Sequence, residues 1–440
     1  MDRRYRLFSW EHSYFSGKVR SYLRYKKRLG DLDYEDILAS ADLIQGLLLP
    51  ATGTGAVPQL QTPDGSFVQD SSEIIDFCER QHPEPAVIPE PSTRPRQCLA
   101  GYLIELLADE WMVVYAFFER WHHSLPFIEP NHARFNAQQW GPVFAPDSGG
   151  SARRELAQTM FSGPMGATDP ESPRGIFAGV RALGVTPRTE TAWTASSERV
   201  LDLLERHFDE HDFVLGGRPS LADFSLMGPL YAHLFRDAVP GFAMRTRHPL
   251  VAEWVERTNG TNALNARTYD QKLYSLGEGG SLVPRPAARH AGQWLPDDTV
   301  PETLRAILQV FFSEMWPMLT STLSSLRSYL ASDSHTAGAE LPGKTFTSTP
   351  GFEALQTGEG ALTHEFEIGG VRERRMVLPY QVWMLQRLAD ALRACRATAA
   401  GRDGLEELLG ALDGGKALLD LDALLAGCRV RKEGGRIFSA

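Results

Sequence analysis

The stretch AVPQLQTPDGSFVQDSSEIIDFCE, Ala56 to Glu79, combines a Val-Pro dipeptide, a turn and an acid-Ser pair within one short span. Because Pro58 lacks an N–H, it fits a strand entry or a special turn, a cis turn included, but not the centre of a sheet. Val57 before it is held extended, which leaves its N–H and C=O free to pair with a ligand lying alongside. This order of features describes a site for a small anionic peptide.

The rest of the stretch predicts a hairpin followed by a helix. Pro63-Asp64-Gly65 supplies the turn between two short strands, and Phe67-Val68 belongs to the second strand. Asp70 and Ser71 then open the helix. A helix N-terminus with a free hydroxyl attracts a carboxylate, while Asp70 can pair with an ammonium, so one locus would hold both ends of an α-amino acid group. An ordinary hairpin with an Asp/Ser cap is the plainer alternative.

This combination of residues resembles the thioredoxin-like N-terminal domain of the glutathione S-transferases. The resemblance implies that glutathione is the cosubstrate. It also implies that Val57 and Pro58 bind the cysteinyl backbone of glutathione, while Asp70 and Ser71 hold its γ-glutamyl group. Two further segments of the chain agree with this reading.

The first segment lies upstream, where Tyr5 to Ser9 predicts a buried strand and the residues after it predict a helix. The intervening SYFSGKVR is similar to the pattern of the Ser-type classes, which puts Ser13 at the position that stabilises the glutathione thiolate. A simple helix cap is the alternative role of Ser13. Tyr14 is a weaker rival hydroxyl donor, and His12 is expected to be exposed and idle.

A hydroxyl at a helix N-terminus can donate a hydrogen bond to a thiolate and lower the thiol pKa from its ordinary value of about 8.5. More thiolate at neutral pH means faster attack on an electrophile. Phe15 and Ser16 stand where cysteines of related thiol-disulfide enzymes would be, so disulfide exchange through the chain itself is disfavoured.

The second agreeing segment is Phe213 to Leu234, in which Ser220-Leu221-Ala222-Asp223 predicts a capping box. It resembles the box that opens the core helix of the all-helical C-terminal domain in the same family, where its role is structural. The apolar stripe from Leu99 to Trp121 predicts the first helix of that domain. The resemblance covers about Met1 to Gly260.

The family builds its electrophile pocket where the first helices of the second domain overhang the glutathione site. This places Tyr14, Tyr115, Phe118 and Trp121 as candidate pocket residues, and ordinary core packing is the alternative for each. Met160 and Phe161 are further candidates. Between Trp121 and Thr189 the periodicity is weak, and the segment WGPVFAPDSGGS is typical of a loop.

Beyond Thr261 the family gives no guidance. A polar linker, roughly Gly277 to Asp298, leads to further predicted helices. Two hairpins are predicted, Thr363 to Val377 around Gly369-Gly370 and Cys428 to Phe438 around Gly434-Gly435. This extension could pack on the core, extend a dimer or cover the pocket.

Composition bounds the remaining possibilities. The chain has 440 residues and a formal net charge of −10, which argues against nucleic acid as a bulk partner. It shows no apolar run long enough to span a membrane, and the start MDRRYRLFSW is not typical of a signal peptide. Its four cysteines have no metal-ligand spacing and no CxxC, which suits a reducing cytoplasm, and no metal is expected.

The sequence thus predicts an α/β thioredoxin-like domain at residues 1–84, an all-helical domain like that of the glutathione S-transferases at 95–262 and a mainly helical α+β extension at 295–440. The predicted function is attack of a glutathione thiolate on a small apolar electrophile, in a cytoplasmic homodimer. The reaction could be conjugation, dehalogenation, ether cleavage or isomerisation. A non-catalytic binding or scaffold protein is the alternative, because LLPATGTGAVP lacks the basic or amide residues that reach the glycyl carboxylate in many members of the family.

Overall fold

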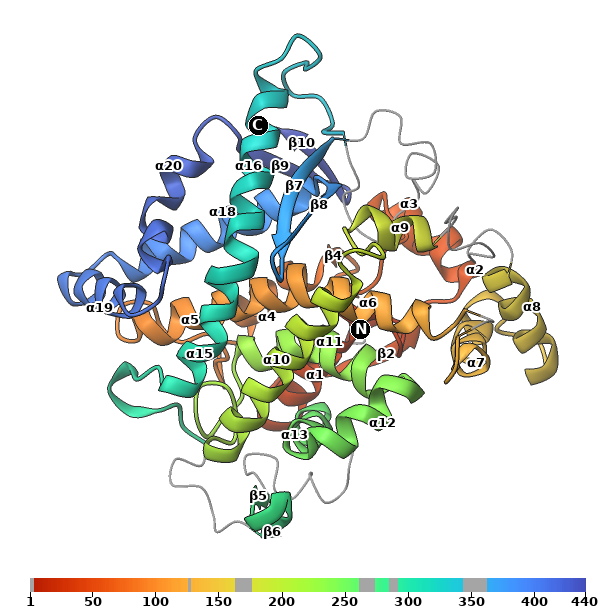
Figure 1. Ribbon diagram of the computed structural model, residues 1–440. Coiled ribbons are helices and arrows are strands. Elements are labelled where there is room, and N and C mark those ends of the chain that lie inside the picture. Colours follow the sequence, from red (N-terminus) through yellow and green to blue (C-terminus); the bar gives the residue numbers. More distant parts are fainter. Residues whose placement is uncertain (1–3, 126–127, 163–175, 261–273, 285–291, 343–361) are drawn as a thin grey trace.

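The computed structural model describes residues 4–125, 128–162, 176–260, 274–284, 292–342 and 362–440 (Figure 1). The chain forms a mixed-sheet domain, a helical domain and an extension that packs against both of them. The fold class predicted from the sequence is confirmed: a thioredoxin-like first domain precedes a helical second domain and a mainly helical extension with some strands.

The first domain is built on a four-stranded sheet in the order β2-β1-β3-β4. β1 and β2 are parallel, whereas β3 is antiparallel to both β1 and β4. Helices α1 and α4 cover the sheet with apolar side chains such as Val19, Leu23 and Ile74, which are all fully buried. The elements are β1 (Tyr5–Ser9), α1 (Tyr14–Leu29), β2 (Tyr34–Leu38), α2 (Ala41–Leu43), η1 (Ile44–Leu48), α3 (Leu49–Thr52), β3 (Gln59–Gln61), β4 (Phe67–Gln69) and α4 (Ser71–Gln81).

Helices α1 and α4 begin as the sequence predicts. Ser13 caps α1 and Asp70 caps α4, each by accepting a hydrogen bond from a main-chain N–H of the first turn. The last turn of α1 is basic, which favours the helix dipole. Asp70 has a positive φ of 94°, an uncommon conformation for a residue with a side chain.

The second domain is helical, and its central helix α11 starts at the predicted capping box. The Asp223 carboxylate accepts from the Ser220 N–H at 2.9 Å and from the Ser220 hydroxyl at 2.8 Å. It also accepts from the Val214 N–H and the Trp254 indole, so one buried carboxylate joins three segments. The elements are α5 (Pro95–Leu107), η2 (Ala108–Met112), α6 (Val113–His122), α7 (Ala133–Phe144), α8 (Gly150–Ser162), α9 (Ile176–Ala182), α10 (Glu190–Glu210), α11 (Leu221–Pro229), η3 (Leu230–Phe235), α12 (Ala238–Arg247) and α13 (Pro249–Asn259).

The loop prediction for WGPVFAPDSGGS is wrong at both ends, because Trp140 to Phe144 end α7 and Gly150 with Ser151 begin α8. α7 packs closely against α8: a Cβ on Gly141 would come within 2.7 Å of Cβ of Arg153. Tertiary packing therefore stabilises a helix that the local Gly-Pro sequence disfavours.

The extension shares a hydrophobic core with the second domain, and α18 lies along α5 (Figure 1). Both predicted hairpins form, with turns at Gly369-Gly370 and Gly434-Gly435. The elements from the linker onward are β5 (Tyr274–Leu276), η4 (Glu278–Gly280), β6 (Leu282–Pro284), η5 (Pro296–Asp298), α15 (Glu302–Val310), η6 (Phe311–Met315), α16 (Trp316–Leu330), β7 (Thr363–Ile368), β8 (Val371–Met376), α18 (Pro379–Cys395), α19 (Ala399–Gly410), η7 (Gly415–Asp420), α20 (Leu421–Leu425), β9 (Val430–Glu433) and β10 (Arg436–Ser439).

None of the helices in the described ranges is both long enough and apolar enough to cross a membrane.

Candidate functional site

Three loops that carry the predicted site residues emerge at one end of the sheet. Phe8 of β1 is paired with Gln59 of β3, and Gln59 is paired with Gln69 of β4. Because β3 is antiparallel to its two neighbours, the end of β1, the start of β3 and the end of β4 lie at the same end of the sheet. The loop with Ser13, the loop with Val57 and the turn at Asp70 therefore converge there.

Ser13 is half-buried at the N-terminus of α1. Its Oγ accepts a hydrogen bond from the Ser16 N–H at 3.4 Å, which leaves the hydroxyl hydrogen able to donate elsewhere. The unpaired N–H groups of the first turn favour an anion at this point. Both roles weighed for Ser13, the helix cap and a donor to a thiolate, are compatible with this geometry.

The Val57-Pro58 peptide bond is cis, and Val57 is half-buried beside Phe8. Among the described residues, no hydrogen bond uses the main-chain groups of Val57. The loop before it is held by the Gln59 side chain, whose Nε2 donates to the carbonyls of Thr54 at 2.9 Å and Ala56 at 3.0 Å. The chain thus presents an extended, hydrogen-bond-competent segment on a fixed support.

Asp70 is engaged from two sides. Its Oδ1 accepts from the Ser72 N–H at 3.0 Å, as expected of a helix cap. Its Oδ2 accepts from the Tyr380 hydroxyl at 2.6 Å and forms an ion pair with Lys432 Nζ at 3.0 Å. Burial acts to raise the pKa of Asp70, but the Lys432 charge and the Tyr380 hydroxyl outweigh it and hold that pKa below its ordinary value. Ser71, the next residue, is buried.

The two groups on Asp70 both come from the extension. Lys432 lies in β9, with a side chain only 7% exposed, and its ammonium is 3.2 Å from Glu73 and 4.3 Å from the centroid of the Trp383 ring. The tip of the same hairpin reaches the loop before Val57: a Cβ on Gly435 would come within 3.1 Å of the Thr54 side chain. The β9–β10 hairpin therefore borders the converging loops on two sides.

A buried group of charges lies next to the first turn of α4. Lys18 Nζ donates to Glu105 Oε1 at 2.7 Å, to Asp109 Oδ2 at 2.6 Å and to the Ser72 hydroxyl at 3.0 Å. These contacts tie α1, α4 and α5 together. They also support the first turn of α4, where Ser71 lies.

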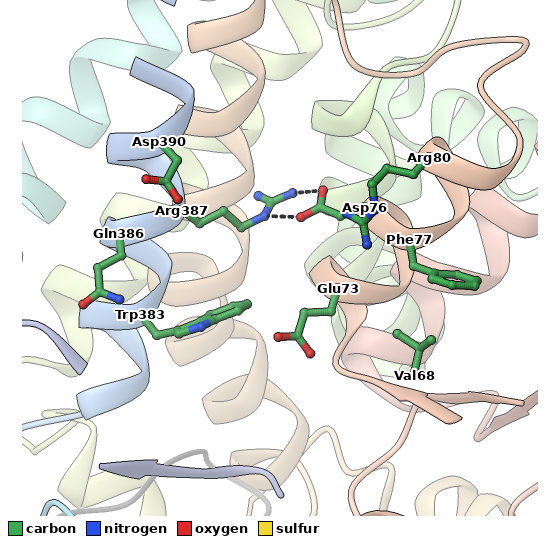
Figure 2. Close-up of a pocket in the computed structure, with 9 residues that line it drawn as sticks. All are labelled: Val68, Glu73, Asp76, Phe77, Arg80, Trp383, Gln386, Arg387 and Asp390. Atoms are coloured by element: carbon green, nitrogen blue, oxygen red, sulfur yellow. Dashed lines mark hydrogen bonds and ion pairs between the residues drawn. The ribbon is translucent and has the colours of Figure 1, made fainter. Parts of the chain in front are cut away.

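A pocket of about 460 Å³ separates α4 from α18 (Figure 2). Arg387 of α18 crosses one end of it and forms an ion pair with both carboxylate oxygens of Asp76, at 2.6 and 2.9 Å, and with the buried Glu105. Figure 2 shows Trp383 and Glu73 on opposite walls of this pocket. Its lining residues are Val68, Glu73, Asp76, Phe77, Arg80, Trp383, Gln386, Arg387 and Asp390.

The candidate pocket residues separate into two groups. Tyr14, Tyr115 and Phe118 are buried in the main core, and the Tyr14 hydroxyl donates to the Ala108 carbonyl at 2.6 Å. That hydrogen bond removes Tyr14 as a rival donor to a thiolate. Trp121 instead packs near Trp140, at 6.4 Å between ring centroids. The side chains of Met160 and Phe161 lie outside the described residues.

Trp10, His12 and Trp140 form an aromatic cluster at the Ser13 loop that the sequence reasoning missed. The ring centroids of His12 and Trp140 are 4.4 Å apart, and those of Trp10 and Trp140 are 5.2 Å apart. His12 is buried, not exposed as expected, and burial followed by the charge of Arg120 lowers its pKa well below the ordinary value. The sequence contained part of the signal for this cluster, because Trp140 lies in the segment that was predicted to be a loop.

All four cysteines are free and buried. Burial raises the pKa of Cys78 to about 12, and burial also raises the pKa of Cys428. Buried thiols of this kind are poor nucleophiles. A thiolate at the Ser13 edge would therefore have to come from a bound molecule.

Two family models match the sequence. Residues 7–86 match the model described as glutathione S-transferase, N-terminal domain, and residues 185–257 match the model described as glutathione S-transferase, C-terminal domain. No curated protein matches the chain.

Several solved structures are similar over 60–65% of this chain. A glutathione S-transferase from Rhodospirillum rubrum is 18% identical, covering 65% of this chain and 97% of that one, with a TM-score of 0.36. One from Methylobacterium radiotolerans, in complex with glutathione sulfonate, is 22% identical, with coverages of 60% and 94% and a TM-score of 0.32. The beta-etherase LigF from Sphingobium is 16% identical, with coverages of 60% and 98% and a TM-score of 0.38. At these identities and TM-scores, none of the three likenesses indicates what this chain binds or catalyses.

Proposed function

The chain belongs to the glutathione S-transferase family, and we propose that it is a glutathione-dependent transferase whose Ser13 activates the thiol of the bound cosubstrate. Val57 and Pro58 would bind the cysteinyl part of glutathione through the main chain. Asp70 and Ser71 would bind the ammonium and the carboxylate of its γ-glutamyl end.

One observation carries this proposal: the register of the sheet brings the Ser13, Val57 and Asp70 segments to the same end of the sheet. Ser13 has a hydroxyl at the positive end of a helix, Val57 has main-chain groups that no described residue hydrogen-bonds, and Asp70 with Ser71 places an acid beside a second helix N-terminus. In that order, these protein groups would bind a thiol, a peptide backbone and an α-amino acid group of a ligand.

The proposed chemistry begins with loss of the thiol proton, favoured by the Ser13 hydroxyl and the N–H groups of α1. The thiolate lone pair then forms a C–S bond to an electrophilic carbon of a small apolar substrate. In a substitution, the electron pair of the broken bond departs with the leaving group. In an addition, the π electron pair of the attacked double bond moves away from the new C–S bond, and the resulting carbanion takes up a proton from water. Conjugation, dehalogenation, ether cleavage and isomerisation all begin with this same attack.

A second candidate function is that of a family member that keeps the fold as a binding or scaffold protein without the chemistry. The specific observation in its favour is the Lys432 ammonium, which is already paired with Asp70. A γ-glutamyl ammonium would have to compete with it.

Calorimetric titration of the full chain with glutathione is the deciding measurement, repeated with Asp70→Asn, Ser13→Ala and Ser13→Thr. The transferase hypothesis expects binding by the wild type, loss of binding with Asp70→Asn, and turnover of a generic chloro-nitroaromatic electrophile that Ser13→Ala removes and Ser13→Thr retains. Absence of glutathione binding by the wild type would leave the scaffold function.

The homodimer, the cytoplasmic location and the apolar acceptor stay part of this proposal. Light scattering on the purified chain tests the dimer, and a mass of one chain at micromolar concentration would exclude it.

A further inference from the structure

The peptide bond between His12 and Ser13 is held at both of its polar atoms. The Ser13 N–H donates to the Trp10 carbonyl at 3.1 Å, within the first domain. The His12 carbonyl accepts from Nη1 of Arg120, in the second domain, at 2.6 Å. Because a peptide unit is planar, fixing its C=O and its N–H fixes the orientation of the whole unit. The main chain from which the Ser13 side chain starts is therefore held by both domains.

Arg120 lies on α6 and is buried, with a side chain 3% exposed. Its guanidinium forms a two-pronged ion pair with Asp237, because Nε lies 2.7 Å from Oδ2 and Nη2 lies 3.0 Å from Oδ1. Nη2 also donates to the Ala232 carbonyl. With the bond to His12, these contacts fix the plane of the guanidinium, so the His12 carbonyl meets a donor of fixed position.

Asp237 is committed to this ion pair. It is 1% exposed and is the N-cap residue of α12, but its side chain makes no cap hydrogen bond to that helix. An N-cap aspartate ordinarily accepts from the first turn of its own helix, and here the carboxylate pairs with Arg120 instead. The two residues, called the Arg120 clamp below, connect α6 and α12 to the turn before Ser13.

The side chain of His12 is fixed as well. Its ring is stacked on that of Trp10, with 6.0 Å between the ring centroids and 6° between the planes, and it meets the Trp140 ring edge-on. On the other side of Ser13, the Ser13 carbonyl accepts from the Gly17 N–H at 3.0 Å. With the main chain held on both sides, rotation about χ1 is the chief freedom left to the Ser13 hydroxyl.

The Arg120 clamp as a whole carries no net charge, because Asp237 balances Arg120. Its contribution to the turn is therefore the fixed position of the His12 carbonyl. Such a contribution is large where a reacting group must be oriented, since a displacement of about 1 Å can lower a rate by about a hundredfold.

We propose that Arg120 is a positioning residue for the activation of the thiol, a role that rests on the proposed function. By holding the His12 carbonyl, it keeps the Ser13 hydroxyl directed to the place where the thiolate of bound glutathione would lie. Asp237 supports this role by holding Arg120. The second domain would thus take part in the thiol chemistry, which the sequence assigns to residues of the first domain.

Arg120→Lys is the decisive variant. It keeps a positive charge beside Asp237 but loses the planar fork that can bond to Asp237 and to the His12 carbonyl at the same time. Asp237→Asn is an independent second variant, because it leaves Arg120 intact and removes the charge that holds the guanidinium in place. If Arg120→Lys fails to fold, Asp237→Asn decides.

Arg257→Lys is the matched control. Arg257 is fully buried, lies 3.1 Å from the Glu253 carboxylate and donates to the Asp212 carbonyl at 2.8 Å. It therefore makes the same kinds of contact as Arg120, but it lies on α13 and makes none of the contacts described for the Ser13 turn.

Three quantities are measured on the full chain. The first is the hydrogen exchange rate of the Ser13 N–H without ligand, by mass spectrometry of peptides that span residues 9–16. The second is the pKa of the thiol of bound glutathione, from the ultraviolet absorbance of the thiolate. The third is turnover of the chloro-nitroaromatic electrophile.

In Arg120→Lys the Ser13 N–H should exchange about tenfold faster or more, and turnover should fall by about tenfold or more. The thiol pKa should rise toward that of the free peptide, while the affinity for glutathione should change by less than about twofold. Asp237→Asn should change all three quantities in the same direction. Arg257→Lys should lower the unfolding temperature and leave the three quantities unchanged.

Two results would overturn the positioning role. One is an exchange rate of the Ser13 N–H that neither Arg120→Lys nor Asp237→Asn changes. The other is faster exchange with an unchanged thiol pKa and turnover, which would make Arg120 a structural residue only. Absence of glutathione binding by the wild type is a separate result: it removes the proposed function and the role in thiol activation together, whereas the exchange rate still reports whether the Arg120 clamp holds the Ser13 turn.

Discussion

The ammonium of Lys432 lies 3.0 Å from Oδ2 of Asp70, the carboxylate that the sequence assigns to the amino end of a ligand. A lysine side chain ends in the same group as the amino end of glutathione, so the last hairpin of the described chain offers Asp70 an internal partner of the same chemistry. Tyr380 strengthens this arrangement by donating to the same oxygen at 2.6 Å. The affinity for glutathione is therefore coupled to the position of the hairpin.

Lys432→Met should bind glutathione more tightly than the wild type. The substitution keeps the length of the side chain over Trp383 and removes the ammonium that competes for Asp70. Release of one partly buried ion pair corresponds to about 1 kcal/mol, or roughly a fivefold gain in affinity. Calorimetry at low ionic strength measures the gain. Arg431→Met, one residue earlier and 43% exposed, is the control and should leave the affinity unchanged. Weaker binding by Lys432→Met would mean that the ammonium contacts the ligand instead.

Ser13→Ala should remove turnover and raise the thiol pKa of bound glutathione toward that of the free peptide. The variant loses the hydroxyl donor but keeps the N-terminus of α1, so binding itself should change little. It should also lose about 1 kcal/mol of stability, because Ser13 caps the helix. The ultraviolet absorbance of the bound thiolate as a function of pH measures the pKa. An unchanged pKa, with the stability loss alone, would leave Ser13 as a cap.

Glu110→Gln should flatten the dependence of stability on pH. The folded pKa of Glu110 is about 8, above the ordinary value, so the folded chain binds its proton more tightly than the unfolded chain does. Between about pH 4 and pH 8 the native state holds more protons, and stability therefore falls as pH rises, by at most about 1.4 kcal/mol per pH unit from this one group. Urea unfolding at several pH values measures the slope. Glu406→Gln, on the exposed face of α19, should leave the slope as it is; an unaltered slope for Glu110→Gln would contradict the assignment.

Arg387→Met should destabilise the protein by roughly 3 kcal/mol, because it leaves the buried Glu105 with less compensation and breaks the pair with Asp76. Urea unfolding measures the loss. Arg393→Met is the matched substitution on the same helix: its side chain is 55% exposed, and the expected change is about 0.5 kcal/mol or less. Equal effects of the two variants would show that the bridge across the pocket contributes no more than a surface pair.

The first domain could be predicted from the sequence because its signals are local. Pro58 restricts the strand entry, Asp70 and Ser71 start a helix, and Ser220 with Asp223 forms a capping box; each of these rests on residues within a few positions of one another. The same locality placed Ser13 at the start of α1. Element type and order follow directly from such patterns.

The contacts made by the extension could not be predicted in this way. Lys432 pairs with Asp70, and the charge of Arg375 acts on Glu110, only because β8 and β9 fold back over helices far away in the chain. A lysine in a short hairpin and an arginine in a charged strand read as solvent-exposed, since neither carries a local sign of burial. His12 was misjudged for the same reason, because the aromatic rings that bury it come from α7 as well as from its own loop.

Glu105 restricts the motion of the first domain relative to the second. This one carboxylate of α5 accepts hydrogen bonds from Lys18 of α1, from Ser72 at the start of α4 and from Arg387 of α18. Any rotation of the first domain against the second would pull Lys18 and Ser72 away from this buried anion, at a high free-energy cost. Entry and exit of a ligand should then proceed by peeling the small β9–β10 hairpin, and the two large domains should move as one body without a hinge between them.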